Sequence, residues 1–588
     1  MTKFIDQISA ELKKAFQSLN YNPDLGRATI SNRPDLCEFQ CNGAMAGAKE
    51  YRKAPLVIAN EVAEKLENNK VFAKVEVAPP GFLNLKVSPA FVRDYLIAMA
   101  KEAKFGLELP QNPLKYVVDY GGPNVAKPLH IGHLRSAIIG ESIKRIIRFA
   151  GHTAIGDIHL GDWGLQMGLI IVELNERKPG LPYFDHEYHG AYPQEAPFTI
   201  AELEEIYPEA SAKSKTDALY REKALKATYD LQKGLLGYRA IWQHIMRLSK
   251  DDLRKNYDDL NVEFDLWKGE SDVQDLIPGM IAEFKEGGFT RLSEGALVID
   301  VKEETDKKEM PPCLILKSDG ASLYITTDLA TILERVNEIA PDAMIYMTDK
   351  RQSMHFEQLF RSARKTGLVS SEMDLRFLGF GTMNGSDGKP FKTRDGGVMR
   401  LEQLVADIND EMYRKIAANR TVSEEEARET ARIVGLAALK YGDLSNQAAK
   451  DYIFDIDRFT SFEGDTGPYI LYTIVRIKSI LKKYTDGGGI IKKDALHEAD
   501  SDEEKALMLV VSGFNSMIEE AYQEIAPHRI AAYIYDLANA LNTFYHHTKI
   551  LTESVNEKQE AYIALLNLTK EILETLIDLL GFSAPERM

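Results

Sequence analysis

The chain has 588 residues, of which 44% are hydrophobic, so it is long enough to form several domains with their own cores. Its net charge of -17 argues against a protein that binds nucleic acid through overall basicity, although it does not exclude local basic faces. Three cysteines without a CxxC pair or a Cys/His quartet predict neither a disulfide framework nor a zinc site. Free thiols, and the lack of a signal peptide or an apolar run of membrane-spanning length, predict a cytoplasmic protein.

Residues 1–112 are predicted to form a separate α+β module. Helical periodicity covers residues 4–18 and 56–69. Short strands are predicted at 75–77 and, after a Pro-Pro-Gly turn, at 82–87.

The next segment predicts a strand, an elbow and a long helix. Residues 116–120 form a β-rich run that ends in turn residues, and apolar residues recur at helical spacing from Leu134 to Ala150. The sequence Lys127-Pro-Leu-His130-Ile-Gly132-His133 lies between them. An elbow from a strand to a helix N-terminus is where an α/β sheet binds anions, because free N–H groups and the helix dipole point at the ligand.

The residue types at this elbow suit a nucleotide. His130 and His133 can donate a ring N–H to phosphate, Lys127 adds a mobile positive charge, and Gly132 leaves room beside the backbone. A histidine at a helix start is more often a capping residue, but two of them flanking Ile-Gly after a strand favour the functional interpretation.

Downstream, strand and helix signals alternate, as a parallel sheet requires. A second strand at 153–157 leads to Gly161-Asp162-Trp163-Gly164, whose glycines suggest either close approach to a ligand or a tight turn with a packed tryptophan. Residues of about 176–305 read as an insertion, with charged helices at 201–207, 214–250 and 253–260. Residues 306–400 are predicted to resume the sheet through strands at 313–316, 343–347 and 375–380, with helices opening at 323–330 and near 353.

The C-terminal part is predicted to be helical, with residues 401–455 as a connecting region and 456–588 as a helical domain. A basic stripe on one predicted helix is followed by aromatic residues in another, which suits unpaired bases, although without the other motifs aromatic residues in a helical-bundle core explain the pattern better. The residues are Arg476, Lys478, Lys482, Lys483, Tyr533, Tyr535, Phe544, Tyr545, His546 and His547.

These motifs together resemble one family. The string Pro123-Asn124-x-x-Lys127-Pro128-x-His130-x-Gly132-His133-Leu134-Arg135-Ser136 is similar to that of class I arginyl-tRNA synthetases, and Gly-Asp-Trp-Gly is a further match. Residues 35–42 and 79–84 resemble the family's N-terminal domain, and residues 536–541 and 583–588 resemble its anticodon-binding domain. The loop Gly388–Gly397 resembles the family's Lys-Met-Ser-Lys-Ser motif, but Thr393-Arg394 replaces a central lysine; Lys127 is thought to compensate in this family.

The resemblance implies a multidomain α/β fold: a Rossmann-like parallel sheet split by an insertion, with an α+β N-terminal and an all-α C-terminal domain. It assigns 1–112 to the outer corner of tRNA, 113–400 to catalysis, 401–455 to a stem-contact region and 456–588 to the anticodon. The implied reaction joins L-arginine to tRNA(Arg) through an adenylate, using ATP with Mg²⁺, without zinc, in a monomer that activates arginine only after tRNA binds.

The resemblance also implies site residues. Asp119 and Asn124 would lie near the α-amino end of the arginine substrate, and Tyr324, Asp328 and Gln352 would lie around its guanidinium. Taken alone, Asp328 also fits a helix cap and Tyr324 a core ring. The implied catalytic residues are Lys127, His130, His133 and Lys392; those for ATP are His130, Gly132, His133, Lys389, Lys392, Thr393 and Arg394; those for arginine are Asp119, Asn124, His133, Tyr324, Asp328 and Gln352.

Two alternatives stay open at this point. One is a class I synthetase for another amino acid, against which the acidic residues and absent zinc ligands speak. The other is a catalytically silent tRNA-binding paralogue, against which the intact His130/His133 pair speaks.

Overall fold

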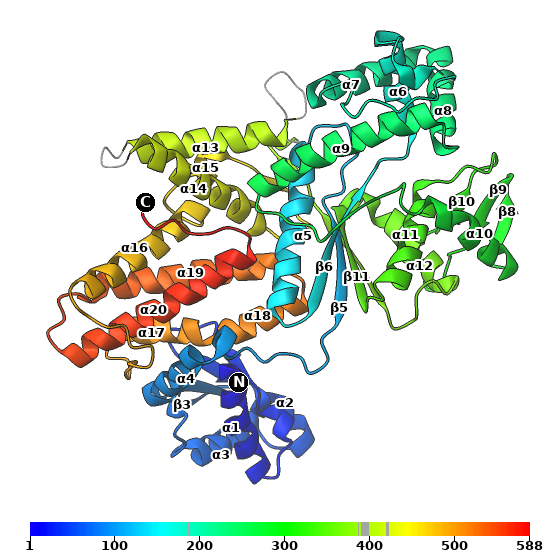
Figure 1. Ribbon diagram of the computed structural model, residues 1–588. Helices are drawn as coiled ribbons and strands as arrows, with labels where there is room; N and C mark the ends of the chain where they lie inside the picture. Colours follow the sequence, from blue (N-terminus) through cyan, green and yellow to red (C-terminus); the bar gives the residue numbers. More distant parts are fainter. Residues whose placement is uncertain (186, 386, 390–398, 419–422) are drawn as a thin grey trace. The chain divides into compact units, whose positions relative to one another are not determined.

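The computed structural model describes residues 1–185, 187–385, 387–389, 399–418 and 423–588 (Figure 1). The chain divides into two compact units. The first unit contains Met1–Gln111, Ser461–Leu579 and Ser583–Met588, and the second contains Asn112–Thr460 and Leu580–Phe582. Among the described residues, no helix is both long and apolar enough to cross a membrane.

The second unit is built on a five-stranded sheet in which every neighbouring pair is parallel. The spatial order is β12-β11-β5-β6-β7, so the chain leaves the central strand β5 first to one side and later to the other. The elbow after β5 therefore lies at the topological switch point, where open α/β sheets bind ligands. The strands are β5 (Lys115–Tyr120), β6 (Thr153–Leu160), β7 (Leu266–Gly269), β11 (Ala343–Asp349) and β12 (Asp374–Phe380).

Helices flank this sheet, and α5 packs against β5, β6 and β11. An apolar core joins β5, β11 and β12 to α10, α11 and α12. The inner strands β5 and β11 are largely buried, as parallel strands covered on both faces are. The helices of the second unit are α5 (Ile131–Phe149), α6 (Leu165–Arg177), α7 (Ile200–Thr216), α8 (Ala218–Gln232), α9 (Leu236–Asp259), α10 (Ile277–Glu286), α11 (Tyr324–Glu338), α12 (Ser353–Lys365), α13 (Leu401–Ala417), α14 (Glu424–Leu444) and α15 (Ile456–Phe459).

Two expectations about this unit are wrong. Residues 313–316 form a strand, β10 (Cys313–Leu316), but it pairs antiparallel with β9 (Ala296–Ile299), which pairs with β8 (Thr290–Ser293), and it does not join the parallel sheet. The left-handed turn at Glu294-Gly295 joins β8 and β9 into a hairpin, to which β10 adds. A short apolar run such as 313–316 does not reveal which sheet its strand will enter. The predicted helix 214–250 is broken at Asp217, whose carboxylate caps α8, and at Gly234, where φ is +91°.

The predicted insertion range also contains β7, which pairs with β6 and extends the parallel sheet. Two short strands, β13 (Met383–Asn384) and β14 (Tyr452–Ile453), form a separate parallel pair beside the main sheet's last strand.

The first unit combines an α+β segment with a helical one. Its four-stranded antiparallel sheet has the order β1-β2-β4-β3, and Lys505 and Asn515 of the helical segment donate hydrogen bonds to the carbonyls of Val87 and Phe105. The predicted fold class is thus confirmed. The elements are α1 (Phe4–Ser18), β1 (Ala28–Ile30), β2 (Phe39–Cys41), α2 (Gly43–Tyr51), α3 (Pro55–Leu66), β3 (Phe72–Ala78), β4 (Phe82–Val87), α4 (Pro89–Lys101), α16 (Gly467–Asp486), α17 (Asp502–Ser512), α18 (Phe514–Gln523), α19 (Pro527–His547) and α20 (Asn556–Leu579).

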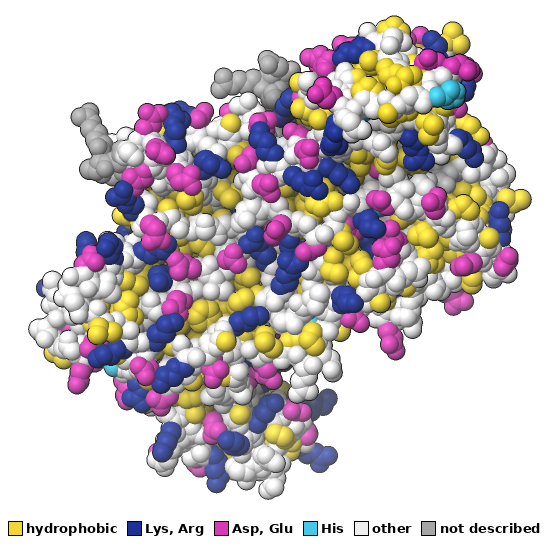
Figure 2. All heavy atoms as spheres, in the orientation of Figure 1, with side chains coloured by type: hydrophobic (Ala, Val, Ile, Leu, Met, Phe, Trp, Pro, Cys, Tyr) yellow, Lys and Arg dark blue, Asp and Glu magenta, His cyan; other side chains and the backbone are white. Residues whose placement is uncertain are grey.

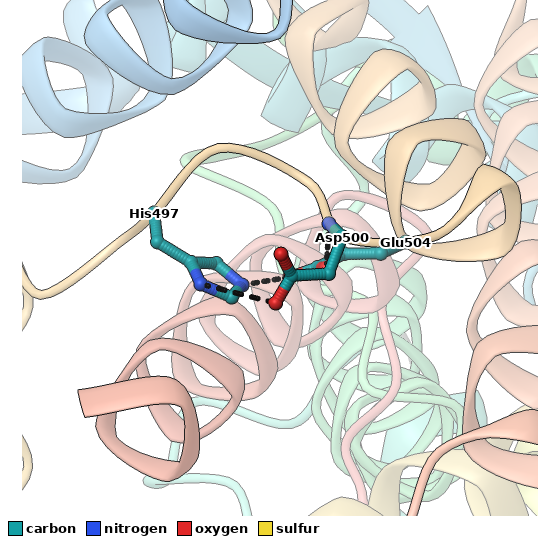
Figure 3. A group of neighbouring side chains, drawn as sticks. All are labelled: His497, Asp500 and Glu504. Carbon is teal, nitrogen blue, oxygen red and sulfur yellow. Dashed lines mark hydrogen bonds and ion pairs between the residues drawn. The ribbon is translucent and has the colours of Figure 1, made fainter. Parts of the chain in front are cut away.

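A charged cluster fastens the connection between α16 and α17 (Figure 3). His497 Nε2 lies 2.7 Å from Glu504, whose side chain is buried, and the His497 Nδ1 atom lies 3.8 Å from Asp500. Lys558 of α20 lies 2.8 Å from the same Asp500 carboxylate. Among the described residues this is the one group of three side chains with the spacing of metal ligands, and each member already has an ionic partner. The cluster therefore links the segment between α16 and α17 to α17 and to α20.

Candidate active site

The two histidines of the elbow form the cap of α5. His130 is the N-cap residue, and its Nδ1 accepts a hydrogen bond from the Gly132 N–H at 3.0 Å. The Nδ1 of His133 accepts from the His130 N–H at 3.2 Å. Because both Nδ1 atoms accept, each ring carries its proton on Nε2 and has that donor left for a ligand. The capping and the ligand-binding interpretations of these residues are therefore compatible.

Both imidazoles are held neutral. Burial and then Lys127 lower the pKa of His130, while burial and then His130 lower the pKa of His133 to about 3. The two rings are tilted by 32° to each other, with their centroids 4.0 Å apart. A Cβ on Gly132 would lie 2.8 Å from the His130 ring, so this glycine makes room for the histidine. The result is a pair of N–H donors at a helix N-terminus, an arrangement suited to phosphate oxygens.

The last two residues of the motif, Arg135 and Ser136, fix the elbow to neighbouring elements. The Ser136 hydroxyl donates to the Met347 carbonyl at 2.7 Å and accepts from the Gly121 N–H at 2.8 Å, so it joins the ends of β5 and β11. Arg135 is buried, and its Nε lies 2.8 Å from Asp443 of α14. Its Nη1 donates to the Gly381 carbonyl at 2.7 Å, just after β12. The motif thus connects α5 to the strands that lead into the second nucleotide segment.

That second segment is described only at its two ends. Lys389 lies in a turn with Gly388, where φ is +73°, whereas Lys392, Thr393 and Arg394 lie outside the described residues. Past this gap the backbone returns to the histidine motif: the Ile131 N–H donates to Met399 O at 3.2 Å, and the Leu401 N–H donates to Leu129 O at 3.0 Å. The chain thus closes the second segment directly onto the first.

Glycines at the ends of β5 and β6 allow these strand ends to approach each other. A Cβ on Gly161 would lie 2.2 Å from Asn124 Oδ1, and one on Gly122 would lie 2.3 Å from the His159 carbonyl. Trp163 is buried, as in the alternative of a tight turn with a packed tryptophan. Asn124 is therefore held by the glycine motif at the edge where the ligand is expected.

The acid at the end of β5 is already paired. Asp119 accepts a hydrogen bond from Arg335 Nη2 at 2.6 Å, and the same guanidinium lies 2.7 Å from Asp157. Burial raises the pKa of Asp119, an effect that Arg335 opposes. Burial alone would lower the pKa of Arg335, but the charges of Asp157 and then Asp119 outweigh it, so the pKa is raised. The Asp119 carboxylate is therefore already paired with the Arg335 guanidinium, and a ligand amino group would bind to it beside that guanidinium.

The predicted guanidinium residues lie on α11 and after β11. Tyr324 is the first residue of α11 and is 65% exposed, so it is not a core ring. Leu323 is the N-cap, which places Asp328 inside the helix and excludes the capping alternative. The Asp328 carboxylate lies 2.6 Å from His355 Nε2 of α12. Gln352 is the residue just before α12 and is exposed.

Glu270, which follows β7, was not predicted from the sequence. Burial, followed by the charges of Asp162 and Asp328, raises its pKa to about 7. The pKa of Tyr324 is raised by desolvation of the hydroxyl group and then by Glu270 and Tyr207. Glu270 therefore belongs to the same charged surroundings as Asp328 and Tyr324. The sequence signal for Glu270 is an acidic residue directly after a strand of the parallel sheet. That strand, β7, falls within the range predicted to be an insertion, so the sequence analysis did not assign it to the sheet.

Taken together, the site can bind two kinds of group. Phosphate oxygens fit the α5 N-terminus, where two N–H donors and Lys127 lie close to one another. A cation fits beside Asp328 and Glu270, because no lysine or arginine pairs with either carboxylate in the part of the chain that the structure describes. These two features suit a triphosphate and a cationic small molecule.

In the first unit, some of the basic and aromatic residues noted in the sequence serve the fold. Lys478 is paired with Glu574 and Glu586, and Phe544 is fully buried. The Arg476 guanidinium, however, lies 4.8 Å from the ring centroid of Tyr472 and 5.1 Å from that of Tyr545. These two rings are 44% and 36% exposed, so this group can stack on an unpaired base.

Comparisons with known proteins agree along the whole chain. Residues 97–456 match the family model described as the catalytic domain of tRNA synthetases class I (R). Residues 470–588 match the DALR anticodon binding domain, and residues 2–87 match the arginyl tRNA synthetase N terminal domain.

Relatives and a solved structure give the same result. Two proteins named arginine–tRNA ligase, from Agathobacter rectalis and Alkaliphilus oremlandii, are 63% and 55% identical to this chain, with 100% of both chains covered in each case. The arginyl-tRNA synthetase of Plasmodium falciparum aligns over 100% of both chains with a TM-score of 0.80 and 25% identity.

Proposed function

The chain belongs to the class I arginyl-tRNA synthetases, ligases that charge tRNA(Arg) with arginine through an aminoacyl-adenylate, and we propose that the site after β5 carries this chemistry with the residues assigned below. The observations that carry the assignment are the pair of neutral imidazole donors at the α5 N-terminus, which lies at the switch point of the sheet, and the two carboxylates of Asp328 and Glu270, whose charges act on each other.

ATP is the nucleotide substrate, and its phosphates bind at the α5 N-terminus. His130 and His133 donate their Nε2–H groups, and Lys127 supplies a positive charge, which together stabilise negative charge that develops on the α-phosphate. Lys389, Lys392, Thr393 and Arg394 are assigned to the departing pyrophosphate on the strength of the motif. Mg²⁺ arrives with the triphosphate, since this ion is usually held by substrate phosphates and water.

Arginine binds with its guanidinium between Asp328 and Glu270, next to Tyr324. A planar guanidinium matches carboxylates in bidentate geometry, and His355 fixes the orientation of one of them. Asn124 and Asp119 are assigned to the α-amino end and Gln352 to the guanidinium side. Because Arg335 already neutralises part of the Asp119 charge, Asp119 serves this end mainly through hydrogen bonding.

The chemistry needs no side-chain nucleophile. The arginine carboxylate attacks the α-phosphorus, pyrophosphate leaves in line, and a ribose hydroxyl of the tRNA 3′ adenosine then attacks the adenylate carbonyl and releases AMP. Catalysis consists of positioning plus electrostatic stabilisation, the terms that usually dominate phosphoryl and nucleotidyl transfer.

The remaining assignments follow from the family. We assign residues 1–112 to the outer corner of tRNA, 113–400 to catalysis, 401–455 to a stem-contact region and 456–588 to the anticodon, with the Tyr472–Arg476–Tyr545 group as a base-stacking surface. We also propose a monomeric, cytoplasmic enzyme that uses no zinc; its cysteines are buried and unpaired.

The test is arginine-dependent exchange of labelled pyrophosphate into ATP, with and without tRNA(Arg), and with lysine and glutamine as controls. We expect exchange with arginine alone among the three, and only when tRNA is present. Exchange with lysine or glutamine would indicate a synthetase of another specificity, and tRNA binding without any exchange would indicate a silent paralogue.

A further inference from the structure

One helix of the insertion contacts both segments of the nucleotide site. The ammonium of Lys127 lies 4.5 Å from the centroid of the Tyr207 ring. On the same helix, Glu204 lies 2.7 Å from the guanidinium of Arg400, in the segment that returns to the histidine motif. Residues three apart share one face of a helix, so α7 presents this acid and this ring side by side to the site.

Tyr207 occupies a position between the two substrates. Lys127 acts electrostatically on both His130 and His133, so its ammonium lies within reach of the phosphate site. Tyr207 in turn is among the groups that act on the Tyr324 hydroxyl, at the arginine end. The ring therefore borders the phosphate site on one side and the amino-acid site on the other.

Helix α7 is anchored firmly enough to act as a support. Thr199 and Glu202 form a reciprocal capping box at its start, and its apolar face is buried. Lys213 of α7 lies 2.7 Å from Glu173 of α6, and Tyr207 packs on a small apolar cluster around Ala210 and Leu169. Because α6 begins directly after the Gly-Asp-Trp-Gly turn, the support is continuous with the site itself.

We propose that Tyr207 and Glu204 are positioning residues for adenylate formation: Tyr207 orients the ammonium of Lys127, and Glu204 holds the segment around Arg400 beside the histidine motif. The physical need is clear, because a lysine is a flexible point charge that contributes only when its four-carbon chain is restrained. An aromatic face restrains it without neutralising it, whereas a carboxylate at that place would cancel the charge. This inference rests on the proposed role of Lys127.

The experiment measures arginine- and tRNA-dependent pyrophosphate exchange for Tyr207→Leu, Tyr207→Phe and Lys127→Ala. Leucine keeps the apolar contacts but removes the aromatic face, and phenylalanine keeps the face. We expect Tyr207→Leu to lower kcat about 3- to 20-fold with KM for arginine within about twofold of wild type, and Tyr207→Phe to retain the wild-type kcat. The matched control is Tyr229→Leu, because Tyr229 on α8 is exposed and faces Lys233 at 5.5 Å in the same way, and neither residue belongs to the proposed site.

A double-mutant cycle separates positioning from a merely structural role. If Tyr207 acts through Lys127, Tyr207→Leu has no further effect on kcat in the Lys127→Ala background. The inference is overturned if the two substitutions lower kcat additively, or if Tyr207→Leu keeps the wild-type kcat while Lys127→Ala is slow. Either outcome leaves the proposed function standing. Wild-type exchange in Lys127→Ala overturns the inference together with the assignment of Lys127, and no exchange by the wild-type protein overturns the proposed function itself.

A second variant covers the case in which Tyr207→Leu fails to fold. Glu204→Gln keeps the size of the side chain and removes the ion pair with Arg400, which is partly exposed. We expect a fall of about two- to fivefold in kcat, restored by the reversed pair Glu204→Arg with Arg400→Glu. An unchanged kcat in Glu204→Gln contradicts this half of the proposal.

Discussion

The imidazole of His355 lies 2.6 Å from the carboxylate of Asp328, across the gap between α12 and α11. Both side chains are 28% exposed, so the pair lies at a surface that a small molecule can reach. A carboxylate held in this way loses little freedom when a guanidinium binds, which favours recognition through preorganisation.

Asp328→Asn is expected to reduce kcat/KM for arginine. The amide leaves a desolvated guanidinium without its charged partner, at a cost of about 3–5 kcal/mol, which corresponds to a factor of roughly 10² to 5 × 10³. Pyrophosphate exchange over a range of arginine concentrations measures this. Asp300→Asn, which breaks the exposed pair with Arg291, is the control and should leave the kinetics unchanged. An unaltered arginine dependence in Asp328→Asn would remove Asp328 from the site.

Arginine affinity is expected to depend on the protonation of Glu270. Its pKa is raised to about 7 by burial, Asp162 and Asp328, and a bound guanidinium favours the charged carboxylate. Binding therefore strengthens as the pH rises through about 7 and weakens below it. Titration calorimetry from pH 5.5 to 8.5 should show proton release on arginine binding, and Glu270→Gln should bind more weakly with a flat profile. A flat wild-type profile would contradict the assignment.

Substitutions of His130 can separate its two roles. His130→Asn keeps a side-chain acceptor for the α5 cap but removes the Nε2–H donor, so we expect kcat to fall about 10²-fold at unchanged stability. His130→Ala also loses the cap and should destabilise the protein by a further 1 kcal/mol or so. Pyrophosphate exchange and urea unfolding measured on both variants test this. Equal activity of His130→Asn and wild type would leave His130 as a cap alone.

The His497 cluster is expected to make the first unit sensitive to pH. Glu504 and then Asp500 raise the pKa of His497, with Lys558 opposing and the ring of Tyr562 alongside. A raised folded-state pKa means that the stabilisation is fully present below about pH 6.5, the unfolded value, and is lost as the pH rises through the folded value. The stabilisation that His497 contributes is the difference in unfolding free energy between wild type and His497→Gln, in which other groups such as Glu270 titrate alike. This difference should be larger at pH 6 than at pH 9, by about 1 kcal/mol or less. An equal difference at the two pH values would place any pH sensitivity elsewhere.

How much of this site could be predicted from sequence depends on the distance between its parts. His130 and His133 lie within four residues of each other, and the local pattern of strand, turn and helix indicates their role. Asp328 could be assigned by family motif, whereas Glu270 could not, because its place depends on β7 joining the edge of the sheet. Tyr207 and Arg335 meet the site only through tertiary packing, which leaves no periodic signal in the chain. The error for β10 has the same origin, since an apolar run of four residues fits either sheet.

The backbone pairing of Leu129–Ile131 with Met399–Leu401 has a consequence during synthesis. The histidine motif leaves the ribosome about 270 residues before its partner, a delay of roughly 15–55 s at about 5–20 residues per second. Throughout that interval the elbow lacks its backbone partner Met399–Leu401, so the nucleotide site of the nascent chain is incomplete. Completion of the ligand pocket, and with it any protection that ATP gives against proteolysis, therefore coincides with the emergence of the last third of the polypeptide.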